Sequence, residues 1–397
     1  MKILYHHRIA SKDGQYVHIE EIVNALKSLG HQVIMVEPKA INQKQFGESS
    51  KLVRTIRSKL PNFIHELIEF GYSFLDFVKI RKAIKKHRPD CIYERYNLLF
   101  PSGIWASKKF NLPLLLEVNA PLFEERLEHD HISLTRLADW SERYVWTNAD
   151  FVLPVTDVLA GKVAKKGVAP ENILVIPNGI NRAQFTQIPD RQKAREKLGL
   201  LNKRIMGFTG FAREWHGLDR VLNVIAILPN INWMLLVVGD GPVRKSLERQ
   251  AQQLGISDNV QFTGIIGRDK VPDYVACFDI ALQPDVVAYA SPLKLFEYLV
   301  LGKAILAPDR ENIREILTDN KDAILFEADN HQDFQQKLIQ LCESEELRNR
   351  LGNAAQQLIA DGGYYWDENA RKITALFKNL LNTETNTSHQ ATVIKAD

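Results

Sequence analysis

The sequence predicts an α/β protein made of two doubly wound domains, each with a parallel sheet. Three observations support this prediction. The chain has 397 residues, more than one ordinary core needs. Short apolar runs alternate with helix-patterned runs throughout, as in parallel crossover units. Some of these runs, such as 112–118, are almost wholly apolar, which is typical of strands covered on both faces.

In the first domain, placed at residues 1–185, strands and helices are expected to alternate. The expected strands are 2–7, 31–38, 89–96, 112–121, 150–156 and 173–180, and the expected helices are 16–30, 101–110, 141–149 and 157–167. Gly30 ends the first helix. Residues 180–203 are polar and interrupted by Pro189, so they are interpreted as the connection between the domains.

The second domain, placed at residues 200–363, repeats this alternation. Its expected strands are 204–211, 232–241, 259–264, 279–284, 303–308 and 322–327, and its expected helices are 216–228, 242–255, 270–278, 291–302 and 311–317. A last helix is expected at about 364–382. Residues 383–397 have little apolar content and are predicted to form a flexible tail.

Residues 43–88 interrupt the first alternation and mix Lys and Arg with apolar residues at helical spacing. One interpretation is a pair of amphipathic helices with solvated basic faces. The other is a surface that docks weakly on anionic lipid.

Composition excludes several classes of protein. Apolar residues make up 45% of the chain, so packed cores are expected rather than disorder. The net charge of +3 is far from the strongly basic balance of nucleic-acid binders, so no nucleic-acid partner is predicted. Cys91, Cys277 and Cys342 are widely spaced, which fits a reducing compartment. There is no signal-peptide core and no apolar run of about 18 residues, so the predicted location is the cytoplasm, at most at the inner membrane face.

Several familiar sequence motifs are missing. The chain has no G-x-x-x-x-G-K-[ST] loop, no complete G-x-G-x-x-G, no D-x-D, no H-E-x-x-H and no G-x-S-x-G. No metal site and no dinucleotide cofactor are therefore predicted.

Ligands of open parallel sheets bind at the carboxyl ends of the strands. In the first domain this places Gly14, the segment 94–96, Glu117 and Asn119 among the candidates. In the second domain it adds 213–216, the segment 239–242 with Asp240 and Gly241, Gly264, and the segment before Ser291.

The helix that starts near Ser291 is the strongest candidate. Ser291 is expected to cap it and Pro292 to occupy its first turn. The amides of Leu293 and Lys294, the ammonium of Lys294 and the helix dipole would then form an anion site. Glu297, one turn later, could accept hydrogen bonds from two vicinal hydroxyls, whereas Leu293, Phe296 and Val300 are expected on the opposite apolar face. The alternative is a capped helix with an exposed Lys-Glu pair.

Two other segments supply candidates for the same ligand. Arg213 could grip two phosphate oxygens, and His216 could contact phosphate or move a proton. Gly14 precedes a helix where phosphate could approach the backbone. The alternatives are a helix-start residue for His216 and a plain turn for Gly14.

The motifs GFAREWHG, VGDGP, FTG and SPLKLFEY, in this order and spacing, resemble family 4 of the retaining glycosyltransferases. The resemblance runs from the SKDGQYVH segment through IPNGI to NIREIL. It implies the GT-B architecture, two Rossmann-like domains facing each other across a cleft, with the last helix packed back on the N-terminal domain. It also implies an acceptor in the first domain and a nucleotide-activated sugar in the second.

Carried over by motif match, Arg213 and Lys294 would hold the diphosphate, Glu297 the ribose and Gly14 the diphosphate or sugar. The chain departs from the pattern at three places. Tyr289 stands where many members have Glu, Asn119 lies at a strand end where many have His, and Phe211 and His216 replace the usual Arg and Lys. We therefore take Arg213, Lys294, His216 and Asn119 as candidate catalytic residues. The candidate binding residues are Gly14, Asp240, Gly241, Ser291, Pro292, Leu293 and Glu297.

The resemblance implies a retaining, metal-independent transfer from a UDP- or GDP-sugar to a glycan or lipid-linked acceptor, as in envelope polysaccharide or glycolipid synthesis. The donor is a co-substrate, and no other cofactor is expected. The alternatives are a GT-B epimerase, a phosphorylase-like enzyme and a catalytically silent subunit of a polysaccharide complex. The sequence predicts no oligomeric state.

Overall fold

The computed structural model describes residues 1–10, 14–38, 61–130, 132–185, 187–228 and 232–393. The chain divides into two compact units, Met1–Pro177 with Trp366–Asp397, and Asn178–Tyr365. Each unit contains one sheet, and every strand pair in the described residues is parallel. The predicted fold class is therefore confirmed.

The sheet of unit 1 has the order β2-β1-β3-β4-β5. Its strands are β1 (Lys2–His6), β2 (Gln32–Val36), β3 (Cys91–Arg95), β4 (Leu114–Val118) and β5 (Phe151–Pro154). Its helices are α1 (Gly14–Ser28), α3 (Asn62–His87), α4 (Ser102–Phe110), α5 (Leu122–Glu125), α6 (Thr135–Thr147), α7 (Asp157–Lys165) and α16 (Trp366–Val393). The strands β3 and β4 are buried along their whole length, as expected for strands covered on both faces.

The sheet of unit 2 has the order β11-β10-β9-β6-β7-β8. Its strands are β6 (Arg204–Thr209), β7 (Trp233–Val238), β8 (Val260–Phe262), β9 (Ile280–Leu282), β10 (Ala304–Asp309) and β11 (Ile324–Glu327). Its helices are α8 (Arg191–Leu198), α9 (Leu218–Ile227), α10 (Arg244–Gln253), α11 (Val271–Ala276), α12 (Leu293–Val300), α13 (Glu311–Arg314), α14 (His331–Glu343) and α15 (Glu345–Gly362).

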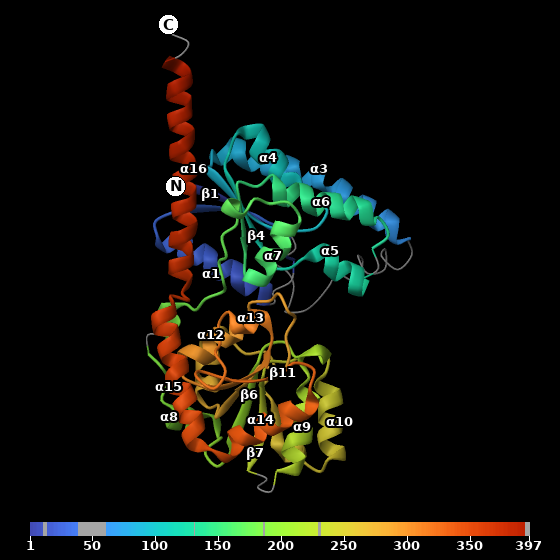
Figure 1. Ribbon diagram of the computed structural model, residues 1–397, viewed down its shortest axis with the longest axis vertical. Helices are drawn as coiled ribbons and strands as arrows, with labels where there is room; N and C mark the ends of the chain where they lie inside the picture. The colour runs from blue at the N-terminus through green and yellow to red at the C-terminus, as the bar shows by residue number, and fades with distance from the viewer. Residues whose placement is uncertain (11–13, 39–60, 131, 186, 229–231, 394–397) are drawn as a thin grey trace. The chain divides into compact units, whose positions relative to one another are not determined.

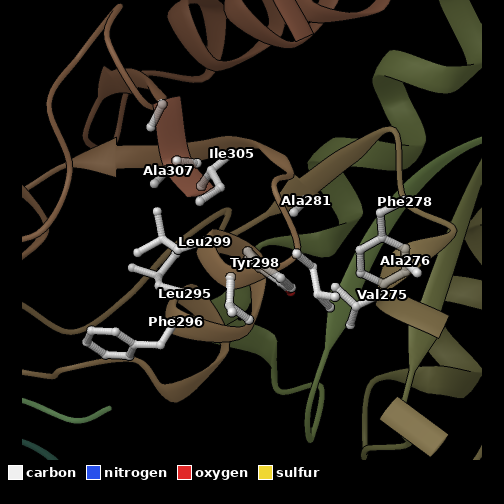
Figure 2. Packing of buried hydrophobic residues seen from close by; sticks show 14 of the residues in the cluster. Val275, Ala276, Phe278, Ala281, Leu295, Phe296, Tyr298, Leu299, Ile305 and Ala307 are labelled. Atoms are coloured by element: carbon white, nitrogen blue, oxygen red, sulfur yellow. The ribbon is translucent and has the colours of Figure 1, made fainter. Parts of the chain in front are cut away.

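The core of unit 2 lies on both faces of its sheet. Along β7, Met234, Leu236 and Val238 join one buried cluster, whereas Leu235 and Val237 join the other. This alternation follows the two-residue period of a strand. Figure 2 shows the first cluster, where α12 packs with residues of α11, β9 and β10.

The last helix returns to unit 1, where Figure 1 shows α16 alongside α1. His31 Nε2 lies 2.9 Å from Thr374 Oγ1, and the Asn369 side chain donates to the carbonyl of Pro177 at 2.7 Å. The ring of Trp366 meets His18 edge-on, with 4.9 Å between the ring centroids. Contacts between residues far apart in the sequence therefore attach α16 to the first unit.

Three expected elements differ in the structure. Residues 173–180 are not a strand: Ile173 makes an isolated bridge to Val152, and the chain then reaches Pro177, which has no amide to continue a ladder. Residues 178–185 and α8, expected in the first domain and in the connection, pack in unit 2 through Ile180, Phe185 and Ala194. The helix α16 continues to Val393, where a flexible tail was predicted.

The segment that interrupts the first alternation contains the 26-residue helix α3. The first of the two helices predicted within 43–88 lies largely in residues 39–60, outside the described residues. None of the helices in the described ranges combines the length and the apolar content that a membrane span requires.

Candidate anion-binding site in the second unit

The strand order of unit 2 predicts where a ligand would bind. The chain winds outward from β6 through β7 to β8, and in the other direction from β9 through β10 to β11. The neighbours β6 and β9 therefore flank the switch point, beyond whose carboxyl ends ligands of such sheets bind. The segments that leave these ends are 210–217, after β6, and 283–292, which leads into α12.

The start of α12 differs from the prediction by one residue. The N-cap is Pro292, not Ser291, and no side chain caps the helix. Ser291 is buried and bonds Asn178 instead: its hydroxyl accepts from the Asn178 amide at 3.1 Å and its carbonyl accepts from the Asn178 side chain at 2.5 Å. Among the described residues, no side chain accepts from the first-turn amides of Leu293 and Lys294, which lie at the positive end of the helix dipole.

Lys294 lies over an aromatic ring at this helix start. Its ammonium is 3.8 Å from the centroid of the buried Phe208 ring of β6, a favourable position for a cation. Next to it, Gly210 has a φ of +121°, and a Cβ there would lie 3.8 Å from Lys294 Cε. Burial lowers the pKa of Lys294 to about 7, although the carboxylate of Glu297 acts in the opposite direction. A lysine amine with this pKa is only partly protonated near pH 7, and an anion that binds beside it favours the protonated form.

Tyr298 anchors α12 to the end of β6. Its fully buried hydroxyl accepts from the amide and the hydroxyl of Thr209, at 2.9 and 3.1 Å, and lies 3.4 Å from the carbonyl oxygen of Leu282. Thr209 is the last residue of β6 and Leu282 the last of β9, so one phenol joins the helix to both strands at the switch point. Figure 2 shows the side chain of Tyr298 in the buried cluster with Ala281 and Phe278.

The buried face of α12 is broader than predicted. Leu293 is half-buried, and the side chains that fill the core are those of Leu295, Phe296, Tyr298, Leu299 and Val300. Glu297 is half-buried on the same side of the helix as Lys294. The predicted Lys-Glu pair is thus partly shielded from water rather than a fully exposed pair.

The segment after β6 places His216 against the same Phe208 ring. The His216 ring meets Phe208 edge-on, with 4.9 Å between centroids, and stacks on Trp215 at 3.7 Å. Its Nδ1 accepts from the Arg213 amide at 3.0 Å, which assigns the proton to Nε2. Burial, with help from the charges of Lys294 and Arg213, lowers the pKa of His216 to about 2. His216 is therefore a neutral N–H donor, and proton transfer by this ring is not favoured.

Arg213 is exposed, and its guanidinium lies 5.4 Å from the ring centroid of Phe211. The backbone amide of Arg213 is held by the ring of His216. An exposed guanidinium keeps its five donors available for an anion.

The segments after β6 and β7 approach so closely that glycine is needed. Gly239 has a φ of +143°, and a Cβ there would collide with the carbonyl of Gly210. A Cβ at Gly241 would collide with the carbonyl of Ala212. The amide of Ala212 donates to the carbonyl of Asp240 at 2.8 Å. The carboxylate of Asp240 accepts from the Gly241 amide at 2.8 Å, so Asp240 and Gly241 support the loop that carries Arg213.

The segment that leads into α12 is fastened along its length. Arg220 donates to the carbonyl of Pro284 at 2.8 Å, and Arg310 lies 3.1 Å from the carboxylate of Asp285. The buried side chain of Asn312 donates to the carbonyls of Val287 and Ala290, at 3.2 and 2.6 Å. These bonds hold the segment that contains Tyr289, which is half-buried.

Two of the predicted site residues, Gly14 and Asn119, belong to unit 1. Gly14 opens α1, and no atom of the described residues lies within 4 Å of the position that its Cβ would take. Asn119 follows β4, and its side chain donates to Glu117 at 2.5 Å.

Glu117 is the centre of a buried network to which Asn119 is attached. It also accepts from Tyr93 at 2.9 Å and from Arg95 at 2.5 Å, and lies 3.0 Å from His18 Nε2. Burial alone would raise the pKa of Glu117, but His18 and Arg95 hold it well below its usual range.

The structure thus groups the predicted residues of unit 2. Lys294 and His216 share the Phe208 ring, Arg213 precedes His216 by three residues, and the loop with Asp240 and Gly241 supports them. Sequence reasoning missed Phe208, Tyr298, Asn178 and Asn312. A tyrosine inside an apolar helix face was the one available signal, because a buried phenol needs a hydrogen-bond partner.

Comparison with protein families decides the classification. Residues 190–358 match the model for glycosyl transferases group 1, and residues 13–179 match the glycosyl transferase 4-like domain. The chain belongs to the group 1 glycosyltransferases. The predicted resemblance to family 4 enzymes is confirmed, because both halves of the chain match.

Individual relatives of this glycosyltransferase are distant. The uncharacterized glycosyltransferase MJ1069 of Methanocaldococcus jannaschii is 24% identical over 245 residues, which span 60% of this chain and 61% of that protein. The putative colanic acid biosynthesis glycosyl transferase WcaI of Escherichia coli is 29% identical, over 71% of this chain and 76% of its own. The alpha-monoglucosyldiacylglycerol synthase of Streptococcus pneumoniae is 23% identical, over 79% and 72%.

Solved structures share the fold across nearly the whole chain. The Anabaena protein Alr3699/HepE, crystallised with UDP, has a TM-score of 0.74 at 18% identity, covering 96% of this glycosyltransferase and all of that chain. The sucrose-phosphate synthase of Thermosynechococcus elongatus has a TM-score of 0.77 at 16% identity, with the same coverage. The GT-B fold of this glycosyltransferase is therefore established.

Proposed function

We propose that this glycosyltransferase moves a sugar from a UDP- or GDP-sugar to a hydroxyl of a glycan or lipid-linked acceptor, in envelope polysaccharide or glycolipid synthesis. The anomeric configuration is retained, and no metal ion takes part. The reaction takes place in the cytoplasm, or at the inner membrane face when the acceptor is lipid-linked. The observation that carries the proposal is the start of α12, where uncapped amides and Lys294 meet the N–H donor His216 around Phe208.

The donor would bind by its diphosphate at the start of α12. The first-turn amides and the helix dipole favour an anion there, and Lys294 and Arg213 supply positive charge. Glu297, one turn further along the helix, would accept hydrogen bonds from the ribose hydroxyls. Pro292 and Leu293 begin this turn, while Ser291 acts indirectly by fixing it to Asn178.

Electrostatic stabilisation of the leaving group would supply most of the catalysis. As the bond from the anomeric carbon to the diphosphate breaks, negative charge grows on the phosphate oxygens. Donors and cations already oriented toward those oxygens lower the barrier more than they tighten ground-state binding. His216 would contribute a neutral Nε2–H, because its pKa of about 2 excludes a cationic ring at neutral pH. Gly14 and Asn119 remain candidates for contacts to the sugar or the acceptor.

The names of relatives and structural neighbours support the proposed classes of donor and acceptor. WcaI is named as a putative glycosyl transferase of colanic acid biosynthesis, and the pneumococcal relative is named as a monoglucosyldiacylglycerol synthase. These names support a glycan or lipid-linked acceptor. Alr3699/HepE was crystallised with UDP. A nucleoside diphosphate donor is therefore the first to test.

Replacing Lys294 by alanine tests the proposed site. We expect turnover to fall by about 10²-fold or more, because a preorganised cation at the leaving group is lost. The thermal midpoint should stay near that of the wild type, since the change removes a cation from a partly dry position. Lys245→Ala, at an exposed position of α10, is the matched control. Near-normal turnover of Lys294→Ala would remove this lysine from the mechanism.

A panel of nucleotide sugars tests the reaction itself. A true donor should raise the thermal midpoint of the wild type, because a ligand that binds the native state stabilises it. NMR of the product then reports whether the anomeric configuration is retained, and transfer in EDTA reports whether a metal ion is needed. Release of free nucleotide with an epimerised sugar and no acceptor would indicate an epimerase. No affinity for any nucleotide would indicate a silent subunit.

A further inference from the structure

The helix α3 of unit 1 has an outer face of unusual composition. Between Phe63 and Val78, every residue of the helix in the exposed class is apolar. These residues are Phe63, Leu67, Ile68, Gly71, Phe74, Leu75 and Val78, and the large ones are 41–59% exposed. Positions 63, 67, 71, 74 and 78 recur every three or four residues, so they form one continuous stripe. Single exposed apolar residues are ordinary, but a stripe of four turns is not.

Three polar residues of this part of α3 are buried instead, namely Glu66, Ser73 and Asp76. Glu66 is buried and accepts from the amides of Ser133 and Leu134, at 2.7 and 2.6 Å. Ser73 is buried and donates to the carbonyl of Leu99 at 2.8 Å.

Asp76 completes the inward set. It is buried, accepts from Ser102 at 2.9 Å, and lies 2.8 Å from His6 Nε2 and 3.2 Å from Arg8. These buried polar residues therefore attach the helix to unit 1, whereas the residues of the apolar stripe are mainly exposed.

The same stripe becomes basic at the end of the helix. From Arg81 to Lys86, every exposed residue is a cation, namely Arg81, Lys82, Lys85 and Lys86. Within the described part of the chain, none of these four side chains is in an ion pair, and no exposed residue between Phe63 and Lys86 is acidic. An apolar stripe that continues into unpaired positive charge complements a bilayer, which has an apolar interior and, where its lipids are acidic, anionic headgroups.

Aromatic rings widen the apolar stripe toward α4 and α6. Phe70 meets Trp140 of α6 edge-on, with 6.1 Å between centroids, and Trp140 is 46% exposed. Phe74 lies 5.1 Å from Trp105 of α4. Figure 1 shows α3 beside α4 and α6. Tryptophan at the margin of an apolar surface is typical of positions at a lipid headgroup boundary.

We propose that the outer face of α3 docks on an anionic lipid bilayer, with the apolar stripe at 63–78 in the headgroup boundary and the cations at 81–86 on lipid phosphates. The helix lies in the plane of the membrane and does not cross it. This inference names a partner surface, goes beyond the proposed transfer reaction, and can be tested without donor or acceptor.

Vesicle co-sedimentation of the full chain tests the docking. We expect the protein to bind vesicles of phosphatidylcholine mixed with phosphatidylglycerol, and to bind pure phosphatidylcholine vesicles far more weakly. Binding should weaken as salt is raised, because the attraction of the basic end is screened. Equal binding to both vesicle types at all salt concentrations would overturn the role of the cations.

Two pairs of variants separate docking from unfolding. Phe74→Ser with Leu75→Ser should weaken vesicle binding by about tenfold or more, because apolar area that enters the boundary is lost. The matched control is Ile227→Ser with Ile265→Ser, two comparably exposed apolar residues of unit 2. Lys82→Gln with Lys86→Gln should lose about fivefold per residue, whereas Lys245→Gln with Arg249→Gln should lose little.

Two further results would overturn the proposal. One is unchanged vesicle binding by the Phe74/Leu75 variant. The other is a wild-type protein that does not co-sediment with anionic vesicles. This is expected if another part of the chain or a second copy covers the outer face of α3. Sedimentation velocity identifies the second copy, because the wild type would then be a dimer and the Phe74/Leu75 variant a monomer. Donor binding is measured in all variants as well. If it is normal, the proposed transfer reaction is not contradicted by any result of the vesicle experiments.

Discussion

A lysine on an aromatic ring with a pKa near 7 is a sensitive anion receptor. Lys294 is partly desolvated on Phe208 and has Glu297 one turn away, so its charge depends on whether an anion is present. An ordinary surface lysine would be charged throughout the neutral range and would gain nothing on binding. The residue therefore links donor affinity to pH.

At the residue scale, UDP affinity is predicted to fall as pH rises from 7 to 9. Below the folded-state pKa of about 7 the ammonium is already charged, and above it the bound diphosphate must recruit a proton. The loss should approach about tenfold per pH unit. Titration calorimetry at several pH values measures it. Lys294→Arg is the control, because a guanidinium stays charged over this range. Identical pH profiles for the wild type and Lys294→Arg would contradict this role for Lys294.

At the element scale, the position of α12 is fixed by hydrogen bonds on its buried side. The helix has only eight residues and no side-chain cap, so it depends on tertiary contacts rather than on its own stability. Tyr298 supplies these contacts by joining it to the ends of β6 and β9, and Asn178 holds the residue before the helix. The anion site thus rests on hydrogen bonds made on the buried side.

Tyr298→Phe is predicted to weaken both folding and donor binding. The variant leaves the buried amide of Thr209 without its acceptor, which should cost about 1–3 kcal/mol of unfolding free energy. Urea unfolding and calorimetry with UDP measure the two effects. Tyr274→Phe in α11 is the matched control, since Tyr274 is half-buried in the same unit. If UDP affinity survived the loss of stability, Tyr298 would be important for packing alone.

At the scale of the whole molecule, the chain is not divided by simple sequence order. The first unit contains both the first 177 residues and the last helix, α16. The residues of unit 2 lie between these two parts in the sequence. Ala370, Ile373 and Phe377 of α16 are fully buried. The stability of unit 1 therefore depends on residues that lie at the far end of the chain.

Phe377→Ala is predicted to destabilise unit 1 by about 3–5 kcal/mol, because a large buried ring leaves a cavity. Lys378→Ala, at the exposed neighbouring position, should change little. Hydrogen exchange followed by mass spectrometry assigns the effect, with faster exchange expected in α1 and in the sheet of unit 1. Faster exchange confined to unit 2 would contradict the packing of α16 on unit 1.

The fold could be predicted in outline because long apolar strands and amphipathic helices are local signals. The runs at β4 and β7 were correctly located, and the start of α12 was predicted to within one residue. Residues 173–180 looked equally strand-like, but whether an extended segment joins a ladder depends on its neighbours in space. Ser291 was expected to cap a helix, and its actual bond is to Asn178, 113 positions earlier.

By itself, the sequence determined the order of strands and helices, the family, and which polar residues follow each strand, since these depend on neighbours along the chain. Only the tertiary structure decided that Lys294 and His216 share one ring, that Tyr298 supports them, and that α3 presents its apolar side outward. These features arise where distant segments bury polar groups together, and a buried polar group must find its partner in space, wherever that partner lies in the sequence.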